Sequence, residues 1–303
     1  MLSFSTCWNS ARHTSGAEMI QEILDLGIHR IELGHGVKVS LLPGIVEMKE
    51  KGAVEITSLH NFCPLPVEVL KASPNCYEFS SHRSSDRERA IRLTKQTIDT
   101  AVRLGATRVV LHLGTIRTMK ITTRDLITMV ENGLIYSRKY TQLKLAMVRE
   151  REKVSAFYLK RVEECLKPIL DHAQANNILL GIECRDRYEE IPSEREIPEL
   201  LTRLGATTGY WHDFGHQQIK HNLGLTDHFQ WLKKIGPQTI GSHLHDVEWP
   251  NDDHRPPFSG EIDFKKLVSY LPQNILFVLE MNPRRSKADI MTAIEQWRGL
   301  FPE

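Results

Sequence analysis

The stretch HLHDVEWPNDDHRPPFSGEIDF (243–264) concentrates side chains that bind metals or move protons. Its first twelve residues hold three histidines and three aspartates: His243, His245, His254, Asp246, Asp252 and Asp253. Imidazoles and carboxylates are common ligands of divalent cations and common general acids and bases. Solvated loops are polar too, so the interpretation depends on what the rest of the chain places beside this stretch.

Polar side chains also recur at the ends of apolar segments along the chain. They are Glu32, His60, His112, Glu183, Asp213 with His216, His243 with Asp246, and Glu280. Buried carboxylates and imidazoles are costly unless they are paired or coordinated. Three carboxylates and one imidazole, from the last four segments, form a set that suits Mn²⁺, Mg²⁺, Co²⁺ or Zn²⁺. We therefore predict a divalent metal site at Glu183, Asp213, His243 and Glu280.

Other residues near this site are candidates for substrate binding or for additional metal ligands. Considered one at a time, His60 and His112 are typical of hydrogen-bonded histidines. Glu32 is typical of a carboxylate that pairs with a neighbouring Arg or His. The spacings Asp213-x-x-His216 and Asp252-x-His254 favour contact with substrate or orientation of ligands, with direct ligation as the alternative. The candidates are His60, His112, His216, Asp252, His254 and Arg255.

Eight short aliphatic or β-branched runs, most of them followed by a helical pattern, organise the chain. They lie near residues 4–8, 29–34, 54–60, 107–114, 178–185, 207–214, 239–246 and 275–282. Several are continuously apolar, as in strands buried on both faces of a parallel sheet. One helix is expected to start at a cap formed by Ser85 or Asp86 and to end at Gly105.

This alternation predicts one (β/α)₈ TIM barrel domain over residues 1–303, in which the strand ends converge on one face. A doubly wound open sheet is the alternative, but no GxGxxG follows the first strand. In the barrel we expect His243 to end a strand and face the metal, and His245 to face elsewhere. Asp252 and His254 are expected to return from the far side of their loop towards the mouth.

The segment between the fourth and fifth strands, about 115–177, is far longer than one helix requires. It interleaves basic residues with apolar ones: Arg138, Lys139, Lys144, Arg149, Arg151, Lys153, Lys160 and Arg161. The pattern favours a pair of amphipathic helices with a solvated basic face. The alternative is a lid or a subunit contact over the barrel mouth, and the insertion is compatible with a homo-oligomer.

Composition narrows the class of protein. The chain has 303 residues, 41% hydrophobic and 25% charged, with a net charge of +1, so no overall electrostatic attraction to nucleic acid or membrane is expected. Its five cysteines form no CxxC pair. No secretory leader and no membrane-spanning apolar run is visible, so we expect a cytoplasmic location.

The motifs IECRDR, WHDFGH, HLHD, DDHRPPFSGEIDF and LEMN together resemble the xylose isomerase-like TIM barrel superfamily over nearly the whole chain. This superfamily includes sugar phosphate isomerases and epimerases and the endonuclease IV type of nuclease. In its isomerase and epimerase branch, the resemblance implies one divalent metal at Glu183, Asp213, His243 and Glu280. It also implies that Glu183 and Glu280 transfer the proton through a metal-bound enediolate, while His216 and Arg255 contact substrate oxygens. The expected substrate is a small sugar or hydroxy-keto compound.

Three alternatives remain. The endonuclease IV branch would add His60, His112, His216, Asp252 and His254 as ligands of a trinuclear zinc cluster. Against it, the fourth strand ends in HLG rather than His-Pro-Gly, and no loop rich in Arg and aromatic residues is evident for DNA insertion. A dehydratase or lyase of the inosose dehydratase type would use the same metal and a carboxylate base. A non-enzymatic barrel that binds metal or sugar would not need the glutamate pair.

Overall fold

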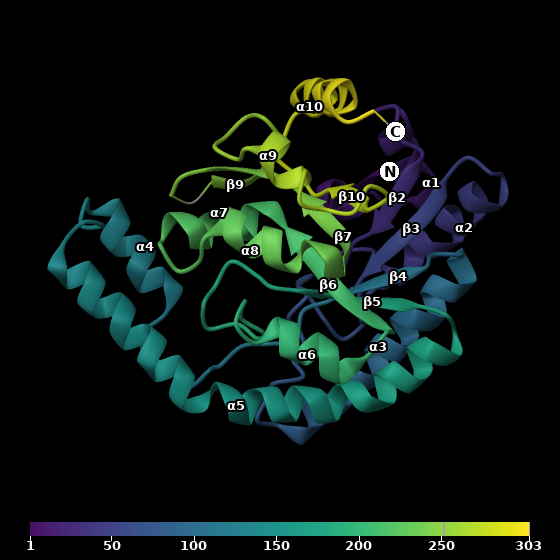
Figure 1. Cartoon of the computed structure of the whole chain (residues 1–303). Helices are drawn as coiled ribbons and strands as arrows, with labels where there is room; N and C mark the ends of the chain where they lie inside the picture. The colour runs from purple at the N-terminus through teal and green to yellow at the C-terminus, as the bar shows by residue number, and fades with distance from the viewer. Residues whose placement is uncertain (251, 303) are drawn as a thin grey trace.

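Eight parallel strands close into a barrel in the computed structural model, which describes residues 1–250 and 252–302 (Figure 1). Around the barrel the strands follow the order β1-β10-β7-β6-β5-β4-β3-β2. Their bounds are β1 Leu2–Ser5, β2 Arg30–Leu33, β3 Glu55–His60, β4 Arg108–Leu111, β5 Leu179–Glu183, β6 Thr208–Asp213, β7 Thr239–Leu244 and β10 Leu276–Leu279. The TIM barrel expected from the strand-helix alternation is confirmed.

The register of the strands brings their polar ends to one level. Asp213 on β6 is paired with His243 on β7, and His243 with Val278 on β10. Glu183 on β5 is paired with Trp211, two residues before Asp213. Because all strands are parallel, these ends lie on the same face of the barrel, where TIM barrel enzymes build their active sites.

The first strand differs from the expected segment at residues 4–8. The chain leaves the sheet after Ser5 and forms a 3₁₀ turn, η1 Thr6–Trp8, in which the Ser5 hydroxyl accepts the amide hydrogen of Cys7. The ring of Trp8 packs edge-on against Phe4 at 5.6 Å. The strand instead begins at Leu2, which is paired with Phe277. Trp8, which lengthened the apolar run in the sequence, therefore packs over the end of the strand and does not continue it.

Helices cover the outside of the barrel. Their bounds are α1 Gly16–Leu24, α2 Leu42–Glu50, α3 Ser84–Leu104, α4 Thr123–Glu131, α5 Arg138–Ala175, α6 Ile197–Leu204, α7 Phe214–Asn222, α8 His228–Ile235, α9 Phe264–Val268 and α10 Lys287–Leu300, with 3₁₀ turns η2 Ser10–Arg12, η3 Val39–Leu41 and η4 Gly236–Gln238. Gly105 ends α3 in the left-handed conformation, as expected. The helix begins slightly earlier than predicted, with Arg83 in the cap position, and Asp86 lies in the first turn, where it accepts the Ser81 hydroxyl.

The long segment after β4 forms two helices, as predicted, and α5 runs along the outside of the barrel (Figure 1). At its start the Tyr140 hydroxyl donates to the carbonyl of Leu223, 2.8 Å away, beyond the end of α7. Arg151 does not lie on the solvated basic face, because its side chain is buried and is hydrogen-bonded to the β5–α6 loop. Through Arg151, the long insertion therefore holds the β5–α6 loop in place.

A buried chain of hydrogen bonds links β6 to helices α7 and α8. Tyr210 donates to His212 Nδ1 (3.3 Å), and the Nε2 atoms of His212 and His228 are 3.1 Å apart. His228 Nδ1 lies 3.2 Å from the Gln218 carbonyl oxygen, which can only accept. Because burial lowers the pKa of both His212 and His228, both imidazoles are neutral, and His228 Nε2 is then the acceptor for His212. Burial and the neighbouring His212 hold the pKa of His228 well below its ordinary range.

We expect the free energy of unfolding to fall as the pH drops below about 6.5, the ordinary pKa of histidine. The unfolded chain then binds a proton at His228 that the folded chain excludes, which contributes up to about 1.4 kcal/mol per pH unit. Urea unfolding at several pH values should give a shallower dependence for His228→Gln than for wild type. The exposed His29→Gln variant should match wild type. An equally steep dependence in His228→Gln would contradict this assignment.

Among the described residues, no helix is both long and apolar enough to span a membrane.

Candidate active site

The strand ends gather the expected site residues at the C-terminal mouth of the barrel. Glu183 and Asp213 are the last residues of β5 and β6, His243 is the penultimate residue of β7, and Glu280 directly follows β10. His60 ends β3 and His112 follows β4. The four proposed metal ligands are all buried, and a carboxylate in such a place requires compensating charge or hydrogen bonds.

The imidazole of His243 lies at the centre of this group. Its Nδ1 atom is 3.3 Å from a Glu280 oxygen, 3.5 Å from a Glu183 oxygen and 3.8 Å from an Asp213 oxygen. This buried nitrogen forms no hydrogen bond within the described residues. On the other side of the ring, Nε2 is 3.1 Å from Glu32, which also accepts the Ser58 hydroxyl at 2.8 Å.

These residues fit a divalent cation. With Nε2 directed to Glu32 as a donor, a neutral His243 presents its Nδ1 lone pair to the three carboxylates, as a metal requires. Three carboxylate oxygens surround that lone pair, an arrangement that is repulsive without a positive charge between them. Burial lowers the pKa of His243, but the Glu280 and Glu32 carboxylates outweigh burial and raise it well above its ordinary range. The electrostatics of the centre therefore favour a cation.

Glu32 has the role that its sequence position suggested, as the partner of a site histidine. Such partners fix the tautomer and orientation of a ligand, and their loss commonly lowers metal affinity about 10- to 100-fold. We expect Glu32→Gln to weaken Mn²⁺ binding by about that factor. Competition titration with a metal indicator measures it, with the exposed Glu55→Gln as the matched control. An unchanged dissociation constant would mean that Glu32 does not orient His243.

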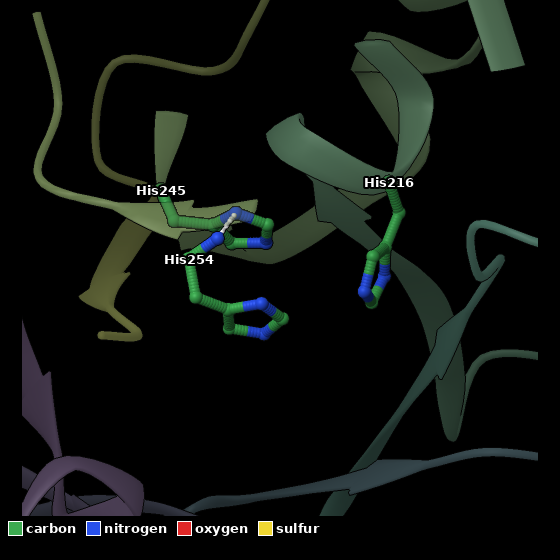
Figure 2. A group of neighbouring side chains, drawn as sticks. All are labelled: His216, His245 and His254. Atoms are coloured by element: carbon green, nitrogen blue, oxygen red, sulfur yellow. Dashed lines mark hydrogen bonds between the residues drawn. The ribbon is translucent and has the colours of Figure 1, made fainter. Parts of the chain in front are cut away.

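His245 lies in the site, contrary to the expectation that it faces elsewhere. Its Nε2 is 2.9 Å from an Asp213 oxygen. Its Nδ1 accepts the backbone amide of His254 (Figure 2). His245 directly follows β7, two residues after His243, and its ring faces Asp213 as the ring of His243 does. Because Nδ1 is an acceptor, Nε2 is the donor to Asp213. His245 therefore holds this carboxylate in place, together with the backbone amide of His216 (2.7 Å).

Three histidine rings approach one another beside the central group (Figure 2). The rings of His245 and His254 stack at 4.0 Å, and His216 faces them from the first turn of α7. His216 Nδ1 is 3.0 Å from Glu183, and His254 Nε2 is 3.8 Å from Glu280. His216 and His254 thus flank the two glutamates that the sequence singled out.

A further group joins Glu183 to His60 and His112. Their Nε2 atoms are 3.6 and 3.0 Å from the same Glu183 oxygen. The Nδ1 atoms face outward, to the Asn61 carbonyl (2.9 Å) and the Asn75 side-chain oxygen (3.2 Å). The atoms of this group lie close enough to hold a metal, as do those of the triad His216, His245 and His254.

Comparison with known proteins matches residues 20–299 to the model of the xylose isomerase-like TIM barrel. The chain belongs to this family. A curated relative, the uncharacterized protein y4fM of Sinorhizobium fredii, is 26% identical over 219 residues. That match covers 72% of this chain and 58% of the relative.

Solved members of the xylose isomerase-like fold superpose over almost the whole chain. A D-tagatose 3-epimerase-like protein has a TM-score of 0.69 at 16% identity, covering 99% of this chain and 96% of its own. The 3-keto-D-glucoside 4-epimerase of E. coli gives 0.68 at 13%, with 98% of each chain covered. D-psicose 3-epimerase from Clostridium cellulolyticum H10 gives 0.65 at 12%, with 99% of each covered. At these identities the likeness establishes the fold.

The hairpin β8 Asp246–Glu248 and β9 Asp252–Arg255 carries His254 to the mouth of the barrel, beside Glu280. The Asp246 carboxylate accepts three backbone amides, from Val247, Gly260 and Ile262, so it fixes the loop rather than facing the metal group. Asp252 is bound by Arg255 at 2.8 Å and by Arg285. Arg255 also pairs with Glu248. The structure therefore places Asp252 and Arg255 in an ion-pair network on the hairpin.

Two further residues near the site were not expected from the sequence. Asn75, which contacts His112, belongs to an irregular loop between β3 and α3, where no local pattern marks it. His35 follows β2 between two glycines, and its ring lies 5.5 Å from that of His60. The strand-end position of His35 was the signal that could have identified it.

Proposed function

We propose that the chain is a divalent-metal-dependent isomerase or epimerase of a small sugar or hydroxy-keto compound. The observation that carries the proposal is the pair of buried glutamates, Glu183 and Glu280, whose oxygens lie 3.5 and 3.3 Å from His243 Nδ1, an atom with no hydrogen bond among the described residues. They come from strands separated in the barrel by β6 and β7. The epimerases among the solved structures of this fold support the same class of reaction.

Glu183, Asp213, His243 and Glu280 would hold the metal. A bound divalent cation would polarise a carbonyl and a neighbouring hydroxyl and so acidify the carbon-bound hydrogen between them. Burial raises the pKa of Glu280, but the imidazoles of His243, His254 and His60 outweigh burial and lower it to about 2. The His112 and His216 contacts likewise lower the pKa of Glu183 well below its ordinary range against the effect of burial. Both side chains are therefore carboxylates, as a proton acceptor must be.

One glutamate takes the proton from carbon, and the second returns it from another direction. Return to the opposite face of the same carbon inverts its configuration, whereas return to the neighbouring carbon isomerises the sugar. Glu183 is held by His112 and His216, which fixes the direction of its oxygens. Within residues 1–250 and 252–302, the ion pairs of Glu280 are with two imidazoles, those of His243 and His254. In this proposal His216 and His254 would contact substrate oxygens.

A second candidate is a multi-metal phosphodiesterase of the endonuclease IV type. The Nε2 atoms of His60 and His112 favour it, because they lie beside the same Glu183 oxygen and the three groups are close enough to hold a second metal. Against it, Asp252, which that branch would use as a ligand, is engaged by Arg255 and Arg285. A lyase or dehydratase would use the same metal and base. It would differ from the isomerase or epimerase in its product.

Two measurements on the purified chain test the proposal. Elemental analysis counts the metal ions per chain, and about one is expected. The metal-loaded protein is then incubated with D-tagatose, D-psicose and L-ribulose, and the products are separated by chromatography. An epimer or aldose isomer supports the proposal. Three firmly held metals, cleavage of an abasic-site duplex and no sugar product would show that the nuclease hypothesis is right instead. Loss of water from the sugar would show that the protein is a lyase or dehydratase.

A further inference from the structure

Arg285 joins the β8–β9 hairpin to the loop that follows β10. Its guanidinium pairs with Asp252 and donates to the backbone carbonyls of Asp253 (3.2 Å) and His254 (3.4 Å). The Arg285 carbonyl accepts the indole hydrogen of the buried Trp8 at 3.0 Å, which anchors this residue to the barrel. One anchored side chain therefore holds three consecutive residues of the hairpin.

Arg255 binds the same aspartate but does not make this connection. Among the described residues, its side-chain partners are Glu248, Asp252 and Ser259, which belong to the hairpin or to the turn after it. The two arginines share the Asp252 carboxylate, since Arg255 binds one oxygen and Arg285 the other. Arg255 therefore stabilises the hairpin internally, whereas Arg285 sets its position relative to β10.

This position matters because His254 has a backbone conformation that few residues adopt. Its φ is 50°, in the left-handed region, which costs a residue with a Cβ about 1–2 kcal/mol. The His254 amide donates to His245 Nδ1 at 3.0 Å. Its carbonyl accepts the Asn282 amide at 3.1 Å and lies 3.4 Å from Arg285 Nε. The conformation of His254 thus depends on hydrogen bonds to the loop after β10, to which Arg285 belongs.

The ring of His254 is held beside one glutamate of the proposed proton-transfer pair. Its Nδ1 lies 3.2 Å from the Asp253 carboxylate, and its Nε2 lies 3.8 Å from Glu280. The side chain keeps 24% of its surface exposed, so it is open to a bound molecule. A shift of the hairpin by about 1 Å would misplace this ring, and a misplacement of that size can cost about 10²-fold in rate.

We propose that Arg285 is a positioning residue that acts through His254 to hold the sugar at the metal site. The inference rests on the proposed function, in which His254 contacts a substrate oxygen. Within residues 1–250 and 252–302, the side chain of Arg285 bonds to the hairpin and to none of the four proposed metal ligands. Its loss should therefore raise KM more than it lowers kcat, and the metal content should not change.

The test compares wild type, Arg285→Met and Arg285→Lys, with the exposed Arg284→Met as the matched control. Each protein is loaded with Mn²⁺ and assayed with D-tagatose, D-psicose and L-ribulose. We expect Arg285→Met to lower kcat/KM by about 10- to 100-fold, mainly through KM. Arg285→Lys should recover only part of the loss, because an ammonium lacks the planar fork of donors that binds a carboxylate and carbonyls together. Arg284→Met should match wild type.

A double-variant cycle separates the positioning of His254 from a general structural role. His254→Phe removes the group that Arg285 is proposed to hold. Adding Arg285→Met to that variant should therefore change kcat/KM by less than about twofold. Backbone deuterium exchange, followed by mass spectrometry, is a readout that needs no substrate. Arg285→Met should exchange faster than wild type at residues 252–255 and at the wild-type rate in the barrel strands.

Two results would overturn the assignment while the proposed function stands. One is an equal loss of kcat/KM from Arg285→Met in the wild-type and His254→Phe backgrounds, which would make Arg285 a structural residue. The other is wild-type kinetics and wild-type exchange in Arg285→Met. A wild type that neither binds nor converts any of the three sugars would remove the proposed function and, with it, the role of Arg285 in substrate binding.

Discussion

Replacing Glu280 by glutamine is expected to lower the rate of sugar conversion by about 10²- to 10⁴-fold, the usual contribution of a positioned acid or base. The side-chain amide introduced by this change would keep an oxygen for the metal but could not accept a proton from carbon. Glu280→Gln should therefore retain metal while losing the reaction. Steady-state kinetics and elemental analysis on the same preparation measure both.

The exposed Glu295→Gln, on α10, serves as the control for the loss of a negative charge. Its kinetics should match wild type. If Glu280→Gln retained wild-type turnover with the metal still bound, the glutamate pair would not be the proton-transfer pair.

Arg151→Met is expected to lower the free energy of unfolding by about 3–5 kcal/mol, as for a buried ion pair that loses one partner. The guanidinium on α5 binds both oxygens of Glu196, at 2.6 and 2.7 Å. It also donates to the carbonyls of Tyr188 (2.7 Å) and Glu190 (2.9 Å). These contacts fasten the β5–α6 loop, which starts directly after Glu183. Urea unfolding measures the change.

The exposed Arg149→Met on the same helix is the matched control and should unfold like wild type. The double variant Arg151→Met with Glu196→Gln should recover part of the loss, because it leaves no unpaired charge in the interior. If Arg151→Met lowered the free energy of unfolding by less than about 1 kcal/mol, which is the range of surface ion pairs, the long insertion would not hold the β5–α6 loop in place.

Much of the site was predictable because a closed parallel barrel converts strand ends into neighbours. Glu183, Asp213, His243 and Glu280 are far apart in the sequence, yet each lies at or directly after the end of a strand, and the fold brings the three carboxylates to one imidazole nitrogen. The alternation of strands and helices therefore sufficed to group them.

The sequence did not reveal what depends on tertiary packing. Arg151 resembles its basic neighbours on α5 until the β5–α6 loop packs against it. Asn75 reaches His112 from a loop without a regular repeat. Asp252, by contrast, has the spacing of a ligand with His254, and only the hairpin geometry shows that two arginines bind it. His245 was assigned to the wrong face: it lies one residue beyond β7, and its ring faces Asp213 as that of His243 does.

The central claim is that a glutamate pair around a metal moves a carbon-bound proton of a sugar. Incubation of the Mn²⁺-loaded protein with D-tagatose, D-psicose or L-ribulose in D₂O, followed by proton NMR, tests it most directly. We predict that one carbon-bound hydrogen is replaced by deuterium, that exchange needs the metal, and that Glu280→Gln abolishes it. Epimer formation without incorporation of deuterium, or exchange that persists in Glu280→Gln with the metal bound, would contradict the account.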